Sequence, residues 1–151
     1  MEVEGLQVVA EGVVVSLDTM KPQVMRAGLE CGAAIINDVN GFRDDDAVAA
    51  LAAADVSCGV VVMHKRGEPQ TMQAAPQYQN VVAEVGDFLR QQKERLVAAG
   101  VGEERICLDP GIGFGKTFGH NLRLLQQLAA FQELDVPLLV GASRKAFIRN
   151  L

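Results

Sequence analysis

Aromatic residues are scarce in this sequence, which has no tryptophan, one tyrosine and six phenylalanines among 151 residues. Because 49% of the residues are nonetheless hydrophobic, the core must consist mainly of Val, Leu, Ile and Ala. This composition is typical of buried parallel strands covered by alanine-rich helices, and the length fits one domain.

Cysteine and histidine are also rare, and their spacing predicts no metal site. Cys31, Cys58 and Cys107 are an odd number without metal-ligand spacing. Each lies within or beside an apolar segment, so we interpret them as reduced and buried. His64 and His120 have no metal-like neighbour and are interpreted as ordinary hydrogen-bonded residues. We therefore name no metal-ligating residue.

The sequence has no excess of positive charge, since its formal net charge is -5. Nucleic-acid binding generally relies on a basic face, so we expect no nucleic-acid partner. No apolar run approaches the roughly 20 residues of a membrane span. The acidic segment Met1–Glu4 lacks the basic start and apolar centre of a signal peptide. We expect a cytoplasmic protein without a membrane partner, whereas local cations can still bind a small anionic ligand.

No hairpin signal interrupts an alternation of short apolar runs and helical segments. Strands are expected at 13–17, 33–36, 58–63, 106–108 and 136–140. Helices are expected at 22–31, 44–54, 78–99 and 120–134, with the tail of one at 6–10 and the start of another at 143–145. We interpret Asp44–Asp46 as helix-capping residues and not as metal ligands. The alternation predicts parallel strands with right-handed crossovers.

The most informative stretch is R-I-C-L-D-P-G-I-G-F-G-K, which ends at Lys116. A short apolar strand ends on Asp109, Pro110 stops it, and three glycines then follow at alternate positions around Phe114. A carboxylate fixed at a strand end beside a flexible, aromatic-bearing loop suits a site that closes over a polar ligand. A glycine-rich connector without a ligand is the alternative.

Two nucleotide-binding motifs nearly fit this stretch but fail on spacing. A G-x-x-x-x-G-K-T phosphate loop would need glycine at Pro110. A G-x-G-x-x-G fingerprint meets Lys116 or Phe118 where its third glycine belongs. The glycines therefore do not predict a nucleotide loop.

The other notable residues also follow the carboxyl ends of expected strands. They are Asp18, Asn37, Met63 with His64, Asp109, and Gly141, Ser143 and Lys145. The carboxyl ends of parallel strands face one rim, and in (β/α) barrels this rim carries the active site. Two carboxylates, a carboxamide and a lysine could bind a flat heterocycle that offers N–H donors and a carbonyl.

Each of these residues has an ordinary structural role that the sequence leaves open. Asp18 and Asp109 could cap the helices that follow them. Asn37 with Asp38 could form a turn, and Lys145 could be a solvated helix residue. Only their shared position at strand ends favours a common site.

Several segments resemble dihydropteroate synthase, in order and spacing, from about Val13 to the end of the chain. They are Ser16–Thr19 (SLDT), Ile35–Asp38 (IIND), Met63–His64 followed by Gly67–Gln73 (GEPQTMQ), Leu108–Lys116 (LDPGIGFGK) and Leu139–Lys145 (LVGASRK). The D-P-G-x-G-F-G-K and S-R-K segments are together highly specific. The resemblance implies an α/β fold of the TIM (β/α)₈ barrel family and an enzyme of folate synthesis.

The resemblance also implies the reaction and its partners. Such an enzyme joins p-aminobenzoate to 6-hydroxymethyl-7,8-dihydropterin diphosphate, with help from Mg²⁺, and releases diphosphate. Sulfonamides bind where p-aminobenzoate binds, and members of the family form dimers. We therefore expect these small molecules as partners and a homo-oligomer.

By the same resemblance, the expected site residues have distinct roles. The pterin ring would be held by Asp18, Asn37, Asp109 and Lys145, and its pocket lined by Met63 and Gly141. Phe114 and Arg144 would flank p-aminobenzoate, with Ser143 and Lys116 as further substrate-binding residues. Ala146 replaces a serine that some relatives place near the benzoate carboxylate, so that contact would fall to a helix amino terminus.

The chain departs from the family pattern in what it lacks. A complete barrel takes about 250 residues and eight strands, whereas about five parallel βα units are expected in residues 1–151. The metal- and diphosphate-binding asparagine of the first strand, the second loop and the last-strand Arg-x-His have no counterpart here. We therefore expect an incomplete pterin-binding domain that turns over substrate poorly or not at all. The alternatives are a non-catalytic pterin-binding or oligomer-forming fragment and a methyltetrahydrofolate-dependent methyltransferase domain.

Overall fold

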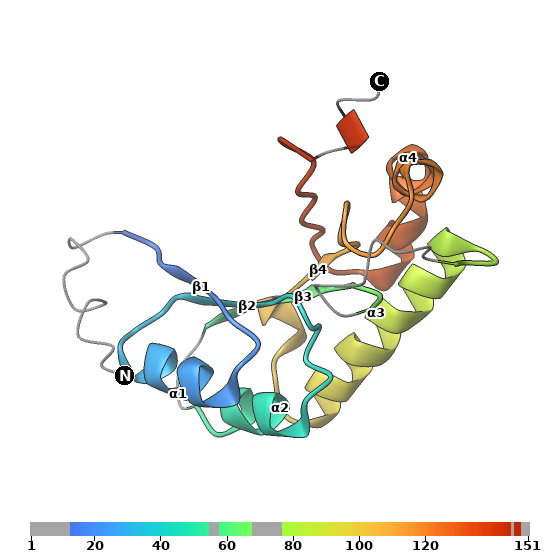
Figure 1. The fold of residues 1–151 in the computed structure, drawn as a ribbon. Coiled ribbons are helices and arrows are strands. Elements are labelled where there is room, and N and C mark those ends of the chain that lie inside the picture. The colour runs from blue at the N-terminus through green and yellow to red at the C-terminus, as the bar shows by residue number, and fades with distance from the viewer. Residues whose placement is uncertain (1–12, 55–57, 68–76, 146, 149–151) are drawn as a thin grey trace.

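The computed structural model describes residues 13–54, 58–67, 77–145 and 147–148. Its elements alternate as the sequence predicts (Figure 1). In chain order they are β1 (Ser16–Asp18), α1 (Pro22–Glu30), β2 (Ile35–Asp38), α2 (Asp45–Ala52), β3 (Gly59–Met63), α3 (Val81–Ala98), η2 (Glu103–Arg105), β4 (Ile106–Asp109), α4 (Phe118–Gln126) and η3 (Leu128–Leu134). The helix tail expected at 6–10 lies outside the described residues.

The four strands form one parallel sheet in the order β1-β2-β3-β4. In the register, Leu17 pairs with Ile36, Ile36 with Val60, and Val60 with Ile106. Each strand therefore lies beside the next one in the sequence, and a helix connects each pair. This confirms the predicted α/β class and its parallel strands.

The fifth expected strand, at 136–140, is reduced to a single parallel bridge between Leu108 and Leu138. Leu108 donates its N–H to the Pro137 carbonyl and accepts a hydrogen bond from the Leu139 N–H, each over 2.9 Å. Pro137 has no N–H to contribute, and Leu139 and Val140 are exposed. Within the described residues the pairing therefore does not extend into a strand.

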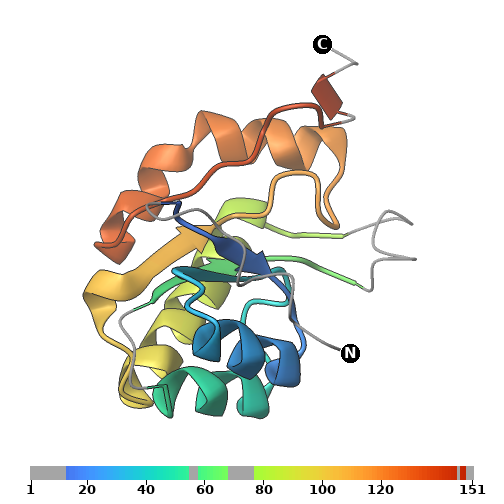
Figure 2. The same ribbon diagram turned by 90° about the vertical axis from the view of Figure 1, so that its left-hand side faces the viewer.

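One face of the sheet carries the hydrophobic core. Alternate strand residues on that face, Ile36, Val60, Val62, Ile106 and Leu108, are no more than 1% exposed. Figures 1 and 2 show α1, α2 and α3 packed along this side of the sheet. Burial of each such side chain contributes about 1.5–3 kcal/mol. The opposite face is therefore the one that remains for polar side chains.

Capping side chains define where the helices begin. The Asp44 carboxylate accepts from the Asp46 N–H over 2.9 Å, which confirms the predicted cap of α2. The Asn80 side chain accepts from the Ala83 N–H over 3.2 Å, so α3 begins three residues later than the expected 78.

The helix expected at 120–134 is divided differently. Thr117 and His120 form a reciprocal capping box, so α4 begins at Phe118. The α-helix ends at Gln126, and the chain continues as the 3₁₀ helix η3. His120 therefore has the ordinary hydrogen-bonded role that its sequence context suggested. Among the helices of the described ranges, none is both long and apolar enough to cross a membrane.

Candidate functional site

Polar and apolar residues on the second face of the sheet lie in two adjacent rows across neighbouring strands. Asp18 pairs with Asn37, Asn37 with Val61, and Met63 with Asp109. Because side chains on adjacent strands point the same way at paired positions, Asp18, Asn37, Met63 and Asp109 face one side of the sheet near its carboxyl rim. The strand register therefore puts these four side chains on one face, as the site prediction requires.

Asp109 ends β4 in an almost fully enclosed position, 7% exposed. One carboxylate oxygen accepts a hydrogen bond from the Gly111 N–H over 2.7 Å. Burial raises the pKa of this carboxyl group, against the opposing effects of the Gly111 hydrogen bond, Lys116 and Lys145. Asp109 does not cap α4, because Thr117 does so. Its second oxygen accepts no hydrogen bond from the residues that the structure describes, and it can therefore accept one from a ligand.

The sequence left open whether Asn37 and Asp38 form a turn or contribute to a binding site, and the structure gives the two residues different surroundings. Asp38 forms the turn, because its carboxylate accepts from the Asn40 N–H over 2.7 Å and the Phe42 N–H over 2.8 Å. Asn37 lies on the opposite face, and its Oδ1 atom is buried without a hydrogen-bond partner among the described residues. A buried carbonyl oxygen without a partner costs about 1–3 kcal/mol. The Asn37 Oδ1 atom can therefore accept a hydrogen bond that no described residue donates.

Asp18 is exposed at the end of β1. It does not cap α1, which begins after Lys21 without a side-chain cap. The Lys21 N–H donates instead to the Thr19 hydroxyl oxygen over 3.1 Å. The Asp18 carboxylate thus lies at the rim and is exposed to solvent.

The glycines of the loop after β4 allow it to pack closely against the segment after β3. Gly111 and Gly115 have φ angles of +67° and +62°. A Cβ atom at Gly111 would lie 1.8 Å from the His64 carbonyl oxygen, and one at Gly115 would lie 2.1 Å from that of Arg66. The expectation of a flexible loop is therefore replaced by a closely packed one, because the glycines permit left-handed backbone and close approach.

Lys116 lies behind this loop and not at the rim. It is 3% exposed, and its Nζ atom lies 2.9 Å from the Gly111 carbonyl oxygen and 3.0 Å from that of Phe114. The same atom lies 3.0 Å from Nδ1 of His64. Burial lowers the pKa of Lys116 to about 7. Because the Lys116 amine is enclosed in this arrangement, the predicted substrate-binding role of Lys116 does not correspond to an amine that is open to a ligand.

Phe114 and Lys145 come together although 31 positions separate them in the sequence. The Lys145 Nζ atom lies 4.1 Å from the centre of the Phe114 ring, which is a cation–π contact. A Cβ atom at Gly113 would lie 3.2 Å from the Lys145 side chain. Lys145 is half-buried. It is therefore a packed residue beside the loop and not a solvated one.

The remaining predicted residues of the last segment lie on the surface. Gly141, Ser143 and Arg144 are exposed. Residues 143–144 form a turn in which Arg144 has a φ of 59°, in place of the expected helix start. A helix needs right-handed backbone at each residue, which Arg144 does not have. The substrate contacts expected of these three residues therefore stay a prediction.

Sequence reasoning did not foresee how His64 and two of the cysteines are buried. His64 is hydrogen-bonded, as predicted, but it is 5% exposed and its partner is Lys116. Cys107 and Cys31 are half-buried, so the expectation of full burial holds for Cys58 alone. Burial and the nearby Asp109 raise the pKa of the Cys107 thiol.

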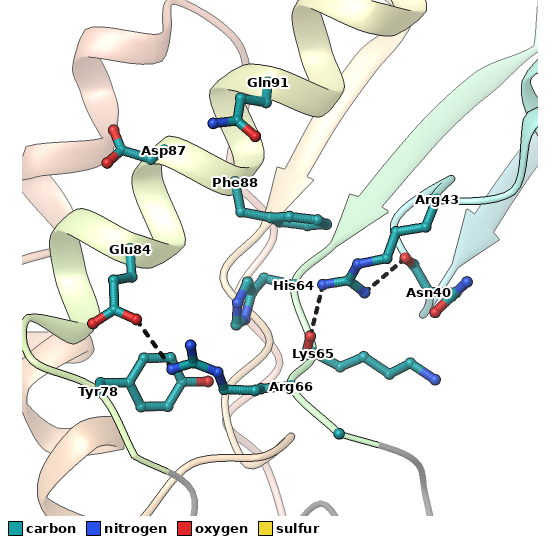
Figure 3. Close-up of a pocket in the computed structure, with 11 residues that line it drawn as sticks. Asn40, Arg43, His64, Lys65, Arg66, Tyr78, Glu84, Asp87, Phe88 and Gln91 are labelled. Carbon is teal, nitrogen blue, oxygen red and sulfur yellow. Dashed lines mark hydrogen bonds and ion pairs between the residues drawn. The ribbon is translucent and has the colours of Figure 1, made fainter.

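A separate cavity of about 570 Å³ lies between the segments after β2 and β3 and helix α3 (Figure 3). It is lined by Asn40, Arg43, His64, Lys65, Arg66, Gly67, Tyr78, Glu84, Asp87, Phe88 and Gln91. Its arginines are already bonded to protein groups. Arg66 pairs with Glu84 over 3.0 Å, and Arg43 donates to the Lys65 carbonyl oxygen over 2.9 Å and lies over the Phe88 ring. None of the predicted site residues lines this cavity.

Comparison with known proteins gives consistent matches. The family model described as "Pterin binding enzyme" matches residues 2–151. The chain is 45% identical over 137 residues to dihydropteroate synthase of Escherichia coli K12, covering 91% of this chain and 48% of that protein. It is 42% identical to the Neisseria meningitidis serogroup C protein of the same name, covering 96% and 52%. The chain thus spans about half the length of the curated relatives it matches.

Solved structures of the same name have the same fold. Dihydropteroate synthase from Thermus thermophilus in complex with 4-aminobenzoate superposes with a TM-score of 0.89 at 46% identity, covering 96% of this chain and 56% of that one. The Yersinia pestis enzyme in a sulfonamide drug complex has a TM-score of 0.89 at 35% identity, covering 96% and 53%. The α/β sheet described here therefore corresponds to part of the barrel of these proteins.

Proposed function

The chain belongs to the family of pterin-binding enzymes, and on this premise we propose that it forms the pterin-binding part of a dihydropteroate synthase site. The reaction would join p-aminobenzoate to 6-hydroxymethyl-7,8-dihydropterin diphosphate, giving dihydropteroate and diphosphate. Residues 1–151 would then be an incomplete pterin-binding domain.

The observation that carries the proposal is the pair formed by Asn37 and Asp109. Asn37 has a buried Oδ1 atom without a partner in the described structure, and Asp109 has an enclosed carboxylate whose pKa is raised by burial. Both face the same side of the sheet. Two buried acceptors require donors, and the ring and amino N–H groups of a pterin are such donors.

Other predicted site residues would make further contacts with the pterin ring. Asp18 would accept a further pterin N–H bond at the exposed edge of the site. Lys145 would donate to the ring carbonyl or a ring nitrogen, and Met63, 3% exposed at the end of β3, would contact the ring with Gly141. The ring would thus bind by acceptors on β1, β2 and β4 and by one cation.

The chemistry follows from this charge arrangement. The bond between the pterin methylene carbon and the diphosphate oxygen breaks, and the diphosphate leaves with the bonding electrons. The cationic methylene that remains would be stabilised by the carboxylates of Asp109 and Asp18. The p-aminobenzoate nitrogen then attacks that carbon and loses a proton. Phe114 and Arg144 would flank p-aminobenzoate, with Ser143 near its carboxylate, and sulfonamides would compete for this place.

Mg²⁺ belongs to the proposed reaction as a partner of the diphosphate. Within the described ranges, no group of three or more His, Cys, Asp or Glu side chains could hold a metal ion. No step is therefore assigned to a metal held by this part of the chain.

Two further expectations concern the chain as a whole. The exposed strand β1 and the exposed residues Leu139 and Val140 lie at the two sides of the sheet, which favours pairing between copies. Since the chain spans about half of its relatives, we expect slow or undetectable turnover. A steady-state rate comparable to that of a full-length relative would contradict this expectation.

Calorimetric titration with the pterin diphosphate tests the proposal. Asp109→Asn keeps the oxygen that accepts from Gly111 but removes the charge, and Asp135→Asn makes the same change at an exposed residue of the η3 end. Binding by the wild type and Asp135→Asn, but at least about tenfold weaker binding by Asp109→Asn, is the expected result. Equal affinities, or binding of methyltetrahydrofolate in place of the pterin diphosphate, would overturn it.

A further inference from the structure

A buried polar cluster lies behind the glycine-rich loop, and the chemistry described above does not use it. Its centre is the Lys116 amine, which lies within 3.0 Å of Nδ1 of His64 and of the carbonyl oxygens of Gly111 and Phe114. The His64 carbonyl oxygen lies 3.3 Å away. Every one of these partners belongs to the segment after β3 or to the loop after β4. The cluster therefore ties two strand ends together.

Such a cluster is costly to bury. Lys116 is 3% exposed and His64 is 5% exposed, and no carboxylate among the described residues forms an ion pair with Lys116. Burial and the neighbouring Lys116 lower the pKa of His64 to about 2, so its ring is neutral. An apolar side chain would avoid the cost of removing an amine from water. What the amine provides instead is a set of hydrogen bonds to main-chain carbonyl groups.

Those hydrogen bonds determine where Phe114 lies. The Phe114 N–H donates to the Gly111 carbonyl oxygen over 3.1 Å, and Lys116 binds both of their carbonyl oxygens. The Asp109 carboxylate accepts a hydrogen bond from the Gly111 N–H. The Oδ1 atom of Asn121, a residue that is 2% exposed, accepts one from the Gly113 N–H over 2.8 Å. The Phe114 ring emerges from this closed turn beneath the Lys145 Nζ atom.

We propose that Lys116 and His64 are a positioning pair that sets the place of the Phe114 ring, and through it the p-aminobenzoate subsite. The inference rests on the proposed function. Lys116 contacts the loop backbone and not the substrate, so it acts through Phe114. Loss of the pair displaces the ring while the sheet residues Asn37 and Asp109 keep their places on β2 and β4. Loss of the pair therefore weakens the binding of p-aminobenzoate more than the binding of the pterin.

Four variants test this assignment. Lys116→Met keeps the length of the side chain but removes the amine, and His64→Leu removes the acceptor. His64→Asn keeps an acceptor at the position of Nδ1 and serves as the rescue variant. Lys93→Met is the matched control, because Lys93 also binds a main-chain carbonyl, that of Leu134 over 2.9 Å, at a place remote from this loop.

Binding is measured first to the pterin diphosphate and then to p-aminobenzoate at saturating pterin diphosphate. We expect Lys116→Met and His64→Leu to weaken p-aminobenzoate binding about tenfold or more, and pterin binding by less than about threefold. His64→Asn and Lys93→Met should stay within about threefold of the wild type for both ligands. Equal losses for both ligands, or no rescue by His64→Asn, would overturn the proposal.

Two ligand-free measurements keep the proposed function and this inference separable. Nitrogen NMR at about pH 6, below the pKa of Lys116, should show a neutral His64 with the proton on Nε2, and Lys116→Met should shift the Nδ1 signal. Hydrogen exchange of the Phe114 amide should accelerate in Lys116→Met but not in Lys93→Met. If the wild type binds neither ligand, the proposed function fails. The positioning pair is then retained only if both signatures appear, and it is rejected if either is missing.

Discussion

The two outer strands of the sheet end on the same residue type but in different surroundings. β1 ends on Asp18, which is exposed, and β2 is the neighbour of β1 among the described strands. β4 ends on Asp109, which is 7% exposed between β3 and the bridge to Leu138. The same position in a βα unit thus gives a hydrated carboxylate at one end of the sheet and a desolvated one at the other.

This difference shows what a strand end provides and what its neighbours add. The strand direction aims both carboxylates at one rim. Only the loop after β4, packed by Gly111 and Gly115 onto the segment after β3, encloses its carboxylate. Because charge interactions strengthen as water is removed, the β4 end should dominate binding and stability, and the β1 end should tolerate change. Substitutions and titrations at the β1 and β4 ends test this difference in binding and stability.

The largest effect is expected for Gly111→Ala. The new Cβ atom would lie 1.8 Å from the His64 carbonyl oxygen at a φ of +67°, so the cost should be about 4 kcal/mol or more. Gly32→Ala is the control, since it also has a positive φ but nothing within 4 Å of the new atom; its cost should be about 1 kcal/mol. Urea unfolding of both variants measures the contrast. Similar losses would show that close packing of the loop matters little.

The next effect compares core positions at the two ends. Leu108→Ala removes a fully buried side chain of β4 and should lower the free energy of unfolding by about 3 kcal/mol. Leu17→Ala, at a half-buried residue of the edge strand β1, should cost about 1 kcal/mol. Denaturant midpoints at equal m values give the comparison. A larger loss at Leu17 would reverse the proposed order of the two ends.

Charge removal at the two carboxylates should separate them in binding. Asp109→Asn should weaken pterin diphosphate binding about 10- to 100-fold, because a charge-assisted hydrogen bond in a dry site is worth roughly 1.5–3 kcal/mol. Asp18→Asn, at an exposed carboxylate, should weaken it less than about fivefold. Calorimetry on the two variants decides this point, and equal losses would mean that the ligand encloses both ends.

Affinity should also fall in acid at a higher pH than an ordinary aspartate would dictate, because the pKa of Asp109 is raised in the ligand-free protein. Protonation removes the acceptor that the pterin N–H groups need, so binding weakens as the pH falls through that pKa. Titrations repeated from about pH 7 downward measure this, and Asp109→Asn should lack the dependence.

The last effect is a pH dependence of stability that belongs to Lys116. Its pKa is about 7 in the folded chain against 10.5 for an ordinary lysine, so between these values the unfolded chain binds the extra proton. The free energy of unfolding should therefore rise with pH, by at most about 1.4 kcal/mol per unit. Above its pKa, the neutral amine still has two N–H groups for the Gly111 and Phe114 carbonyl oxygens.

Comparison with Lys116→Met isolates this effect, because Tyr78 and Cys107, whose pKa values are raised by burial, are unchanged in the variant. Stability measured from about pH 7 to 8.5 should rise more steeply in the wild type. Parallel curves would show that Lys116 keeps an ordinary pKa and lies in a wetter environment.

Much of the fold follows from local sequence signals. Short apolar runs indicated β2, β3 and β4, although β2 begins at Ile35 and not at 33, and proline, aspartate and glycine signals indicated α1 and α2. The fifth strand was wrong in extent, because after the Leu139 N–H donates to the Leu108 carbonyl oxygen the pairing does not continue in the described residues. The helix start at Ser143 was also wrong, since Arg144 has left-handed backbone.

The sequence by itself determined which residues stand at the rim. A carboxylate or carboxamide after a β-branched run is a local pattern, and parallel strands turn that pattern into a common direction. Asp18, Asn37, Met63 and Asp109 were therefore identifiable before any coordinates.

Only the tertiary structure decided the burial and the hydrogen-bond partners of these residues. Asp109 is desolvated because a loop folds over it, the Asn37 Oδ1 atom is buried without a partner among the described residues, and Lys116 is enclosed by backbone that is close in space. Burial and carbonyl contacts depend on segments that are distant in sequence, such as His64 and Lys116. Local spacing contains no information about such contacts, because they arise only when the strands align.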